Sequence, residues 1–315
     1  KSPMFPVNLL RIRSFTAANS AIMFIGLAMG GTFLMVVLFL VSVLGYSELR
    51  AALAITVMPV VALIVAPNSG RLNDRIGPRL PAAAGAASFA TGLILLAQLG
   101  GGTTLWDVMW RVVFLGVGMG LAMPTLSAAS MASLPPQVRG VGSGSLNTMR
   151  QIGFTVGVAL VVAIFTHMVA QNAQHATRQS VGLIATQPQL GPAEKGAYTK
   201  TLITNAQAAA NSGGAAKMTT DPLHGAPQAP GASGAVAFHK LNATVAALYR
   251  NDIADSFTWP FYAAALAALL AIVPALFTGK RLGEHAGHED MTHAQRLESI
   301  GRAEADEAGV PMIDE

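Results

Sequence analysis

The sequence predicts an all-α integral membrane protein with six transmembrane helices, and three observations support this prediction. Charged residues make up 11% of the 315 residues and hydrophobic residues 52%, whereas a soluble globular domain carries about 25% charged residues. Apolar residues gather in windows long enough for the roughly 20 residues that a bilayer requires. Basic residues recur in the short connections on one side of these windows. A soluble fold is excluded because too little charge remains to cover its surface.

Each apolar window is predicted to be a helix, because backbone polar groups in lipid must be hydrogen-bonded within their own segment. The six windows are approximately 15–44, 49–67, 81–99, 105–129, 146–170 and 257–277. The first window is longer than one span needs, so we expect it to tilt or to extend past the bilayer.

The basic residues predict the orientation. They precede the first window, separate the second from the third and the fourth from the fifth, and follow the sixth: Arg11, Arg13, Arg71, Arg75, Arg79, Arg139, Lys280 and Arg281. With six helices, all of these positions fall on one side of the membrane. Lys and Arg in short loops mark the cytoplasmic side, so both ends of the chain are expected to be cytoplasmic.

Five parts follow: a cytoplasmic lead-in (1–14), five transmembrane helices (15–170), a long external loop (171–256), the sixth helix (257–279) and a cytoplasmic tail (280–315). Pro222, Pro227 and Pro230 predict that the middle of the external loop is flexible. Apolar residues at helical spacing over Leu241–Tyr249 predict a short amphipathic helix leading into the sixth window. The opening Lys1–Met4 does not resemble a natural start, so we expect the chain to begin inside a longer protein.

Several classes of site are not expected. The chain has no cysteine, which excludes disulfides and cysteine-ligated metals. Its net charge of +4 lies in loops beside apolar windows, so no nucleic-acid partner is expected. His285, His288 and His293 could bind a metal or belong to a solvated tail, and without a rigid scaffold we predict no metal site. No nucleophile triad or phosphate loop is sensibly placed, so neither an enzyme nor a cofactor is predicted.

The decapeptide GRLNDRIGPR, residues 70–79, lies between the second and third windows. Its glycines, Gly70 and Gly77, would allow a tight reversal between helices. Asp74 could approach a helix N-terminus, while Arg75 and Arg79 could pair with carboxylates or helix C-terminal carbonyls. The segment could thus be a charged clamp that breaks and re-forms, or simply a positively charged turn.

The decapeptide resembles the conserved loop of the major facilitator superfamily, which joins the second and third helices of a six-helix half. Residues 116–124 (GVGMGLAMP) and 139–153 (RGVGSGSLNTMRQIG) resemble the C-terminal half of the fourteen-helix drug/proton antiporters. Gly45–Ser47 and Leu9–Phe15 match the same family. The resemblance covers nearly all of residues 7–170 and, weakly, the sixth window, although the external loop is longer than is usual in this family.

This resemblance implies one half of a transporter bundle that exports hydrophobic drugs or toxic metabolites by proton antiport. The implied partners are a small hydrophobic substrate, protons, the lipid bilayer and the missing N-terminal half of the same transporter. A bacterial plasma or inner membrane is the expected location. Because the windows hold almost no Asp or Glu, the proton-coupling group is expected on the missing half or among the few charges below. The alternative is a non-transporting six-helix protein, either a scaffold or a truncated gene product.

A few polar residues inside windows are candidate gating or cavity residues. Asp107 and Arg111, one helical turn apart, form either an outer gate or coupling pair, or an interfacial ion pair. Arg150 is either a gating or cavity charge or a cytoplasmic anchor, and its neighbours Asn147 and Gln151 could hydrogen-bond across helices.

Pairs of glycines four residues apart predict close helix packing. These pairs are Gly26 and Gly30, Gly116 and Gly120, and Gly153 and Gly157.

Overall fold

The computed structural model describes residues 11–134, 136–188, 190–212, 215–227 and 232–279. Within these residues there are helices and no strands, and six helices are long and apolar enough to cross a membrane. They are α1 (Arg13–Ser42), α2 and α3 together (Glu48–Ile55 and Val57–Ile76), α4 (Arg79–Leu96), α5 (Leu105–Ala132), α6 (Arg139–Thr186) and α10 (Thr258–Leu276). A short 3-10 turn, Pro136–Val138, precedes α6. The all-α membrane fold and the helix count are confirmed.

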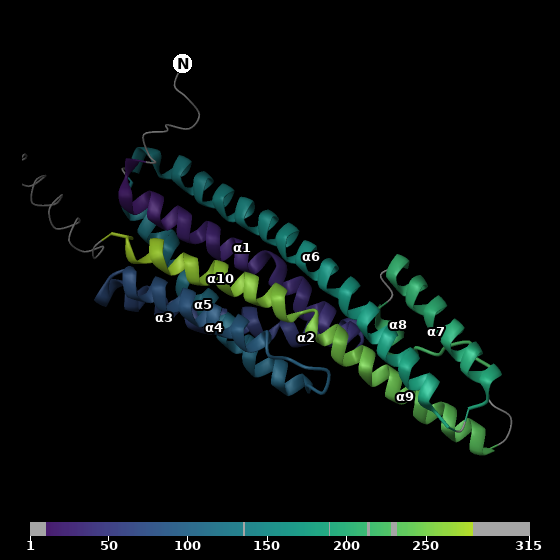
Figure 1. Ribbon diagram of the computed structural model, residues 1–315. Coiled ribbons are helices and arrows are strands. Elements are labelled where there is room, and N and C mark those ends of the chain that lie inside the picture. Colours follow the sequence, from purple (N-terminus) through teal and green to yellow (C-terminus); the bar gives the residue numbers. More distant parts are fainter. Residues whose placement is uncertain (1–10, 135, 189, 213–214, 228–231, 280–315) are drawn as a thin grey trace, which may run out of the picture.

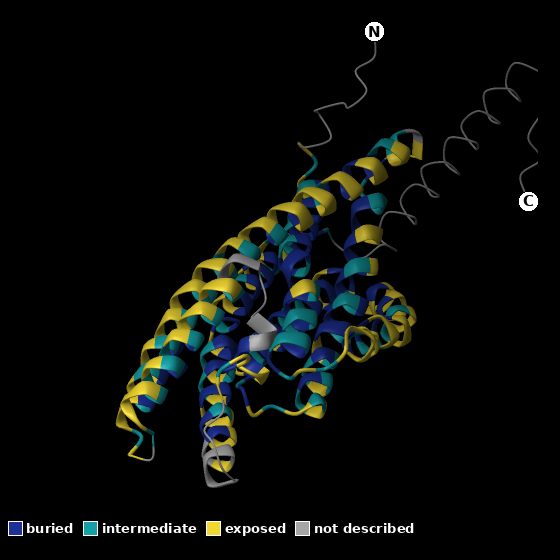
Figure 2. Cartoon of the chain, turned by 90° about the vertical axis from the view of Figure 1, so that its right-hand side faces the viewer, coloured by how far each residue is buried: buried dark blue, intermediate teal, exposed yellow. Residues whose placement is uncertain are grey.

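The six helices form two layers (Figure 1). Helices α1, α6 and α10 pack together in one, and α3 and α4 pack on α5 in the other. The layers meet where α1 contacts α5 and where α10 contacts α4. Buried residues fill the space between the helices, and exposed residues line the outer faces (Figure 2).

Glycines set the closest helix contacts in this bundle. Gly26 and Gly30 of α1 lie against backbone atoms of α6, and Gly153 and Gly157 of α6 lie against backbone atoms of α1. A side chain at any of these four positions would overlap the facing backbone. Gly116 and Gly120 of α5 make the same kind of approach to α3. The predicted close packing at all three glycine pairs is confirmed.

The second window is longer than predicted. Helix α3 continues through Asn73 to Ile76, so most of the decapeptide is helical. The predicted end at residue 67 was wrong because Pro67 lies inside the helix, and neighbouring helices make proline tolerable within a membrane helix.

Most of the segment predicted to be a long loop with a flexible middle, 171–256, is helical. Helix α6 runs for 48 residues, about 72 Å at 1.5 Å per residue, and therefore passes well beyond a hydrocarbon core of about 30 Å. Helices α7 (Pro192–Ser212), α8 (Ala215–Thr220) and α9 (Ala232–Asp255) complete this part. The short helix predicted at Leu241–Tyr249 is the centre of the longer α9. Pro222 and Pro227 do lie in a non-helical connection, and Pro230 falls outside the described residues.

We call residues 171–255 the extension, because they continue the bundle in the direction of α6 and α9 (Figure 1). Its helices pack through buried side chains at helical spacing: Ala176, Ser180 and Ile184 of α6, Tyr198 and Leu202 of α7, and Leu241, Val245 and Tyr249 of α9. The Thr219 hydroxyl of α8 donates to the carbonyl of Ser42 at 2.7 Å and joins the extension to the end of α1. The Phe257 ring packs on both Phe39 and Phe165, where the bundle and the extension meet.

Candidate functional site

The decapeptide forms the turn between α3 and α4 with a single glycine. The backbone N–H of Gly77 donates to the Asn73 carbonyl at 2.9 Å, and Gly77 has φ = 84°, a conformation that residues with a Cβ rarely adopt. Gly70 lies inside α3 and a Cβ there would meet nothing. The predicted role in a tight reversal therefore fits Gly77 and was wrong for Gly70.

Arg79 links three helices at the end of the bundle that carries the decapeptide, which we call the motif end. Its Nε donates to the Thr278 carbonyl at 2.8 Å, just past the C-terminus of α10. The Gly279 N–H in turn donates to the Ser14 hydroxyl of α1 at 2.7 Å. Arg79 is thus bonded to a carbonyl just past the C-terminus of α10. This helix belongs to the same bundle as Arg79 and not to a second one.

Asp74 and Arg75 lie on the exposed side of α3. Neither side chain forms a hydrogen bond or ion pair with any residue in the described part of the chain. The predicted contact of Asp74 with a helix N-terminus is therefore not made within this bundle. Both charged groups can therefore bind another domain or protein that packs on the motif end.

Asp107 caps α5 at the opposite end of the bundle. Its carboxylate accepts from the N–H of Thr104 at 3.0 Å and from the Thr104 hydroxyl at 2.6 Å. Arg111 donates to the Asp107 carbonyl at 2.8 Å and lies over the Trp110 ring, 4.6 Å from its centroid. The two charged groups approach to 4.0 Å. This geometry favours the interfacial ion pair, because the carboxylate is engaged in the helix cap.

Arg150, Asn147 and Gln151 are exposed on α6. Arg150 donates to the Asn147 side-chain oxygen at 2.6 Å, so this bond lies within one helix. Gln151 makes no side-chain hydrogen bond to a described residue. The predicted bonds across helices are absent from the described residues.

The sequence analysis missed a buried polar cluster near the motif end. The Asn19 amide of α1 donates to the Phe15 carbonyl at 2.9 Å and approaches the Ser130 hydroxyl of α5 at 3.5 Å. The Ser145 hydroxyl of α6 donates to the Asn19 side-chain oxygen at 3.3 Å. A lone asparagine within an apolar window is the signal that could have indicated it.

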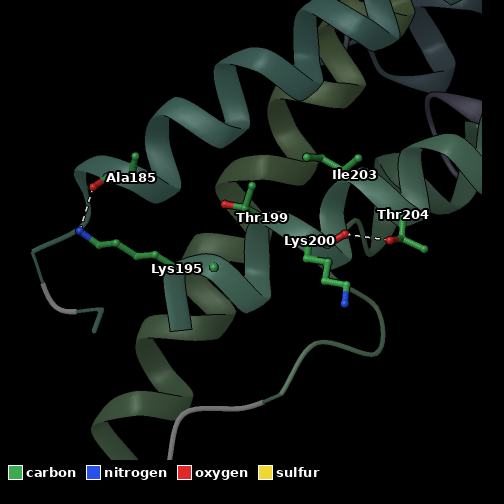
Figure 3. A pocket seen from close by; sticks show the side chains of 7 residues that line it. Ala185, Lys195, Thr199, Lys200, Ile203 and Thr204 are labelled. Carbon is green, nitrogen blue, oxygen red and sulfur yellow. Dashed lines mark hydrogen bonds between the residues drawn. The ribbon is translucent and has the colours of Figure 1, made fainter. Parts of the chain in front are cut away.

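Two cavities lie in the extension. One, of about 540 Å³, is lined by α7 residues including Lys195, Lys200 and Ile203 (Figure 3). Lys195 donates to the carbonyl of Ala185 of α6, another lining residue, at 2.8 Å, and no predicted site residue lines this cavity. The other, of about 510 Å³, lies between α6 and α9. The predicted histidine cluster of the tail falls outside the described residues, and no metal-ligating cluster occurs within them.

Comparison with known proteins supports one family. Residues 1–158 match the profile of the Major Facilitator Superfamily. The chain is 29% identical to the uncharacterized transporter YebQ of Escherichia coli over 58% of its own length and 40% of that protein. It is 29% identical to the multidrug transporter protein MdtP of Bacillus subtilis over 52% of its length and 30% of that protein. It is 31% identical to the probable actinorhodin transporter of Streptomyces coelicolor over 54% of its length and 30% of that protein. The chain thus spans less than half the length of these relatives.

Proposed function

Because this multi-pass membrane chain belongs to the major facilitator superfamily, whose members are transporters rather than enzymes, we propose that it forms one six-helix half of an exporter of hydrophobic small molecules. The export is driven by exchange for protons, and the second half is the N-terminal part of the same transporter. MdtP is named as a multidrug transporter, and the Streptomyces coelicolor relative as a probable actinorhodin transporter. Major facilitator halves enclose substrate near the midplane between them.

The observation that carries this proposal is the uneven burial of the six spans. Within an apolar stretch of 18 residues in each span, only 22% of the residues in α2–α3 and 17% in α6 are buried, against 44–56% in the other four. Both poorly buried helices carry exposed apolar side chains, among them Leu63 and Ile64 on α3 and Val156 and Leu160 on α6. A second six-helix half would cover part of these two faces.

The exposed charges of α3 support a conformational role for the motif end. Asp74 and Arg75 have no partner among the described residues, whereas Arg79 is already bonded to α10. We assign Asp74 and Arg75 to contacts with the second half that form in one conformation and break in the other. A second half that covers α6 as well as α3 would also contact Arg150 and Asn147.

Proton coupling is assigned to the second half. Asp107 is committed to its helix cap, and the apolar windows of the other spans hold almost no further carboxylate. An ionisable group in a span is the usual proton carrier, and this half offers few.

The test is drug accumulation in bacteria that lack their own efflux pumps. Cells would express the complete gene product, its Asp74→Asn variant or its Glu48→Gln variant, which removes an exposed carboxylate at the opposite end of the bundle. The proposal expects lowered accumulation that an uncoupler abolishes, lost in Asp74→Asn and kept in Glu48→Gln. No change in accumulation for any drug or dye would reject multidrug export and favour a non-transporting membrane protein.

A further inference from the structure

The cavity between α6 and α9 lies at the junction of the bundle and the extension. It has a volume of about 510 Å³ and is polar. Helix α6 contributes Gln171, Asn172, Gln174, His175 and Arg178, and α9 contributes Asp252 and Asp255. Four of these five α6 residues, all except Asn172, recur at three- and four-residue intervals and so share one face of that helix. None of them was singled out as a site residue by the sequence.

One basic and one acidic side chain of this cavity have no partner among the described residues. The His175 Nδ1 lies 3.0 Å from an Asp252 carboxylate oxygen. Arg178 and Asp255, in contrast, form no hydrogen bond or ion pair with any described residue, including each other. A cavity with an unpaired guanidinium and an unpaired carboxylate is complementary to a ligand that carries both a negative and a positive group.

Aromatic residues place the cavity at the surface of the bilayer. Trp259 and Tyr262 of α10 and Trp106 and Trp110 of α5 are exposed near the N-termini of their helices. Gly101, just before α5, lies against Asn251 of α9, so these two helix starts are at a similar level. Exposed Trp and Tyr gather where a membrane meets water. The cavity residues Asp252 and Asp255 are one to two turns beyond Trp259, which is the depth of lipid headgroups.

An exposed apolar stripe continues directly from the cavity into the membrane. Along the helical run Phe238–Leu276, the face that holds Asp252 and Asp255 continues at three- and four-residue steps. Its next members are Trp259, Tyr262, Leu266, Leu270 and Val273, all exposed. One face of α9–α10 is therefore charged at the membrane surface and apolar below it. This arrangement is complementary to a lipid with a charged headgroup and apolar chains.

We propose that this cavity binds the headgroup of a phospholipid that carries a primary ammonium and a phosphate. The ammonium donates to Asp255 and to the Asp252 carboxylate, and the phosphate accepts from the Arg178 guanidinium, whose planar fork suits phosphate oxygens. The acyl chains lie along Leu266, Leu270 and Val273. This site is independent of the transport proposal, since it requires only that the chain spans a membrane.

The test measures lipid binding to the complete gene product by native mass spectrometry in a delipidating detergent. Phosphatidylethanolamine is compared with phosphatidylcholine, whose quaternary ammonium donates no N–H bond, with phosphatidylglycerol, which has no cation, and with free phosphoethanolamine. We expect phosphatidylethanolamine to bind most tightly. Equal binding of all three lipids would overturn the headgroup assignment, and equally tight binding of free phosphoethanolamine would overturn the assignment to a lipid.

Variants locate the binding within the cavity. Arg178→Gln and Asp255→Asn should each weaken phosphatidylethanolamine binding by about tenfold or more, because each removes a charge-assisted hydrogen bond. Lys200→Gln removes an exposed charge of α7 outside this cavity and should leave binding unchanged. Both cavity side chains are exposed, so the variants should fold as the parent does. Unchanged binding in Arg178→Gln and Asp255→Asn would overturn the proposed site.

Discussion

The membrane bundle and the extension are both helical, but different contacts hold them together. In the bundle, Gly26 and Gly153 bring the backbones of α1 and α6 into direct contact. In the extension, large side chains fill the space between helices, and the Tyr249 hydroxyl is hydrogen-bonded to Thr177 at 2.6 Å. Lipid offers no hydrophobic drive for helix association, so close backbone packing must replace it. In water, burial of large side chains supplies that drive.

A large effect is expected at the glycine contact of the bundle. Gly153→Ala places a Cβ against the Met23 carbonyl of α1, and such overpacking typically costs about 1–3 kcal/mol or more. We expect a lower thermal unfolding temperature and less monodisperse protein on size-exclusion chromatography in detergent. Gly144→Ala on the same helix is the matched control, because its Cβ would meet nothing, and it should be neutral or slightly stabilising. Equal loss in both variants would show that the close contact with α1 is not what makes Gly153 sensitive to substitution.

A substitution at Tyr249 should loosen the extension and spare the bundle. Tyr249→Ala removes a fully buried ring, and a loss of about 3–5 kcal/mol is usual for a large aromatic residue. Hydrogen exchange should rise in α7 and α9, while α1 and α5 keep their protection. A parallel loss of protection in α1 and α5 would show that the two regions fold as one unit and would remove the contrast between them.

A smaller effect is expected from the buried polar cluster of the bundle. Ser145→Ala removes the hydroxyl that donates to Asn19, and hydrogen bonds between membrane helices contribute about 0.6 kcal/mol on average. The melting temperature should fall slightly, and less than in Gly153→Ala. Ser143→Ala is the control, since its hydroxyl is exposed and bonds only within α6.

An effect as small as that at Ser145 is expected where the extension loses one hydrogen bond and little volume. Thr177→Val removes the hydrogen bond to the Tyr249 hydroxyl, which should lower the stability of the extension by about 1 kcal/mol. We expect faster hydrogen exchange near Tyr249 alone. A larger effect than that of Tyr249→Ala would contradict the view that buried rings dominate the extension.

The sequence predicted correctly those features that follow from the order of residues along one helix. The length of each apolar window predicted the six spans, and glycine spacing predicted the contacts of Gly26, Gly116 and Gly153. Both signals lie within a single helix. The continuation of α6 was missed because its buried residues, Ala176 and Ser180, are small or polar and resemble loop composition.

The candidate site was less predictable because partners are set by tertiary contacts. Spacing alone could not show that Arg79 bonds to the Thr278 carbonyl, 199 residues away along the chain. The Asn19 cluster likewise depends on how three helices cross. Spacing did place Asp107 and Arg111 together, but the capping role of Asp107 required the position of Thr104 at the helix start.

The central claim is that a second half covers the exposed faces of α3 and α6. Nitroxide labels at Leu63, Val156 and Leu266, all exposed in this structure, would report contact with lipid through their accessibility to oxygen. In the complete gene product reconstituted in lipid, we expect low accessibility at Leu63 on α3 and Val156 on α6, and high accessibility at Leu266 on α10. Equally high accessibility at all three positions would show that lipid, and no second half, covers α3 and α6, and would contradict the account.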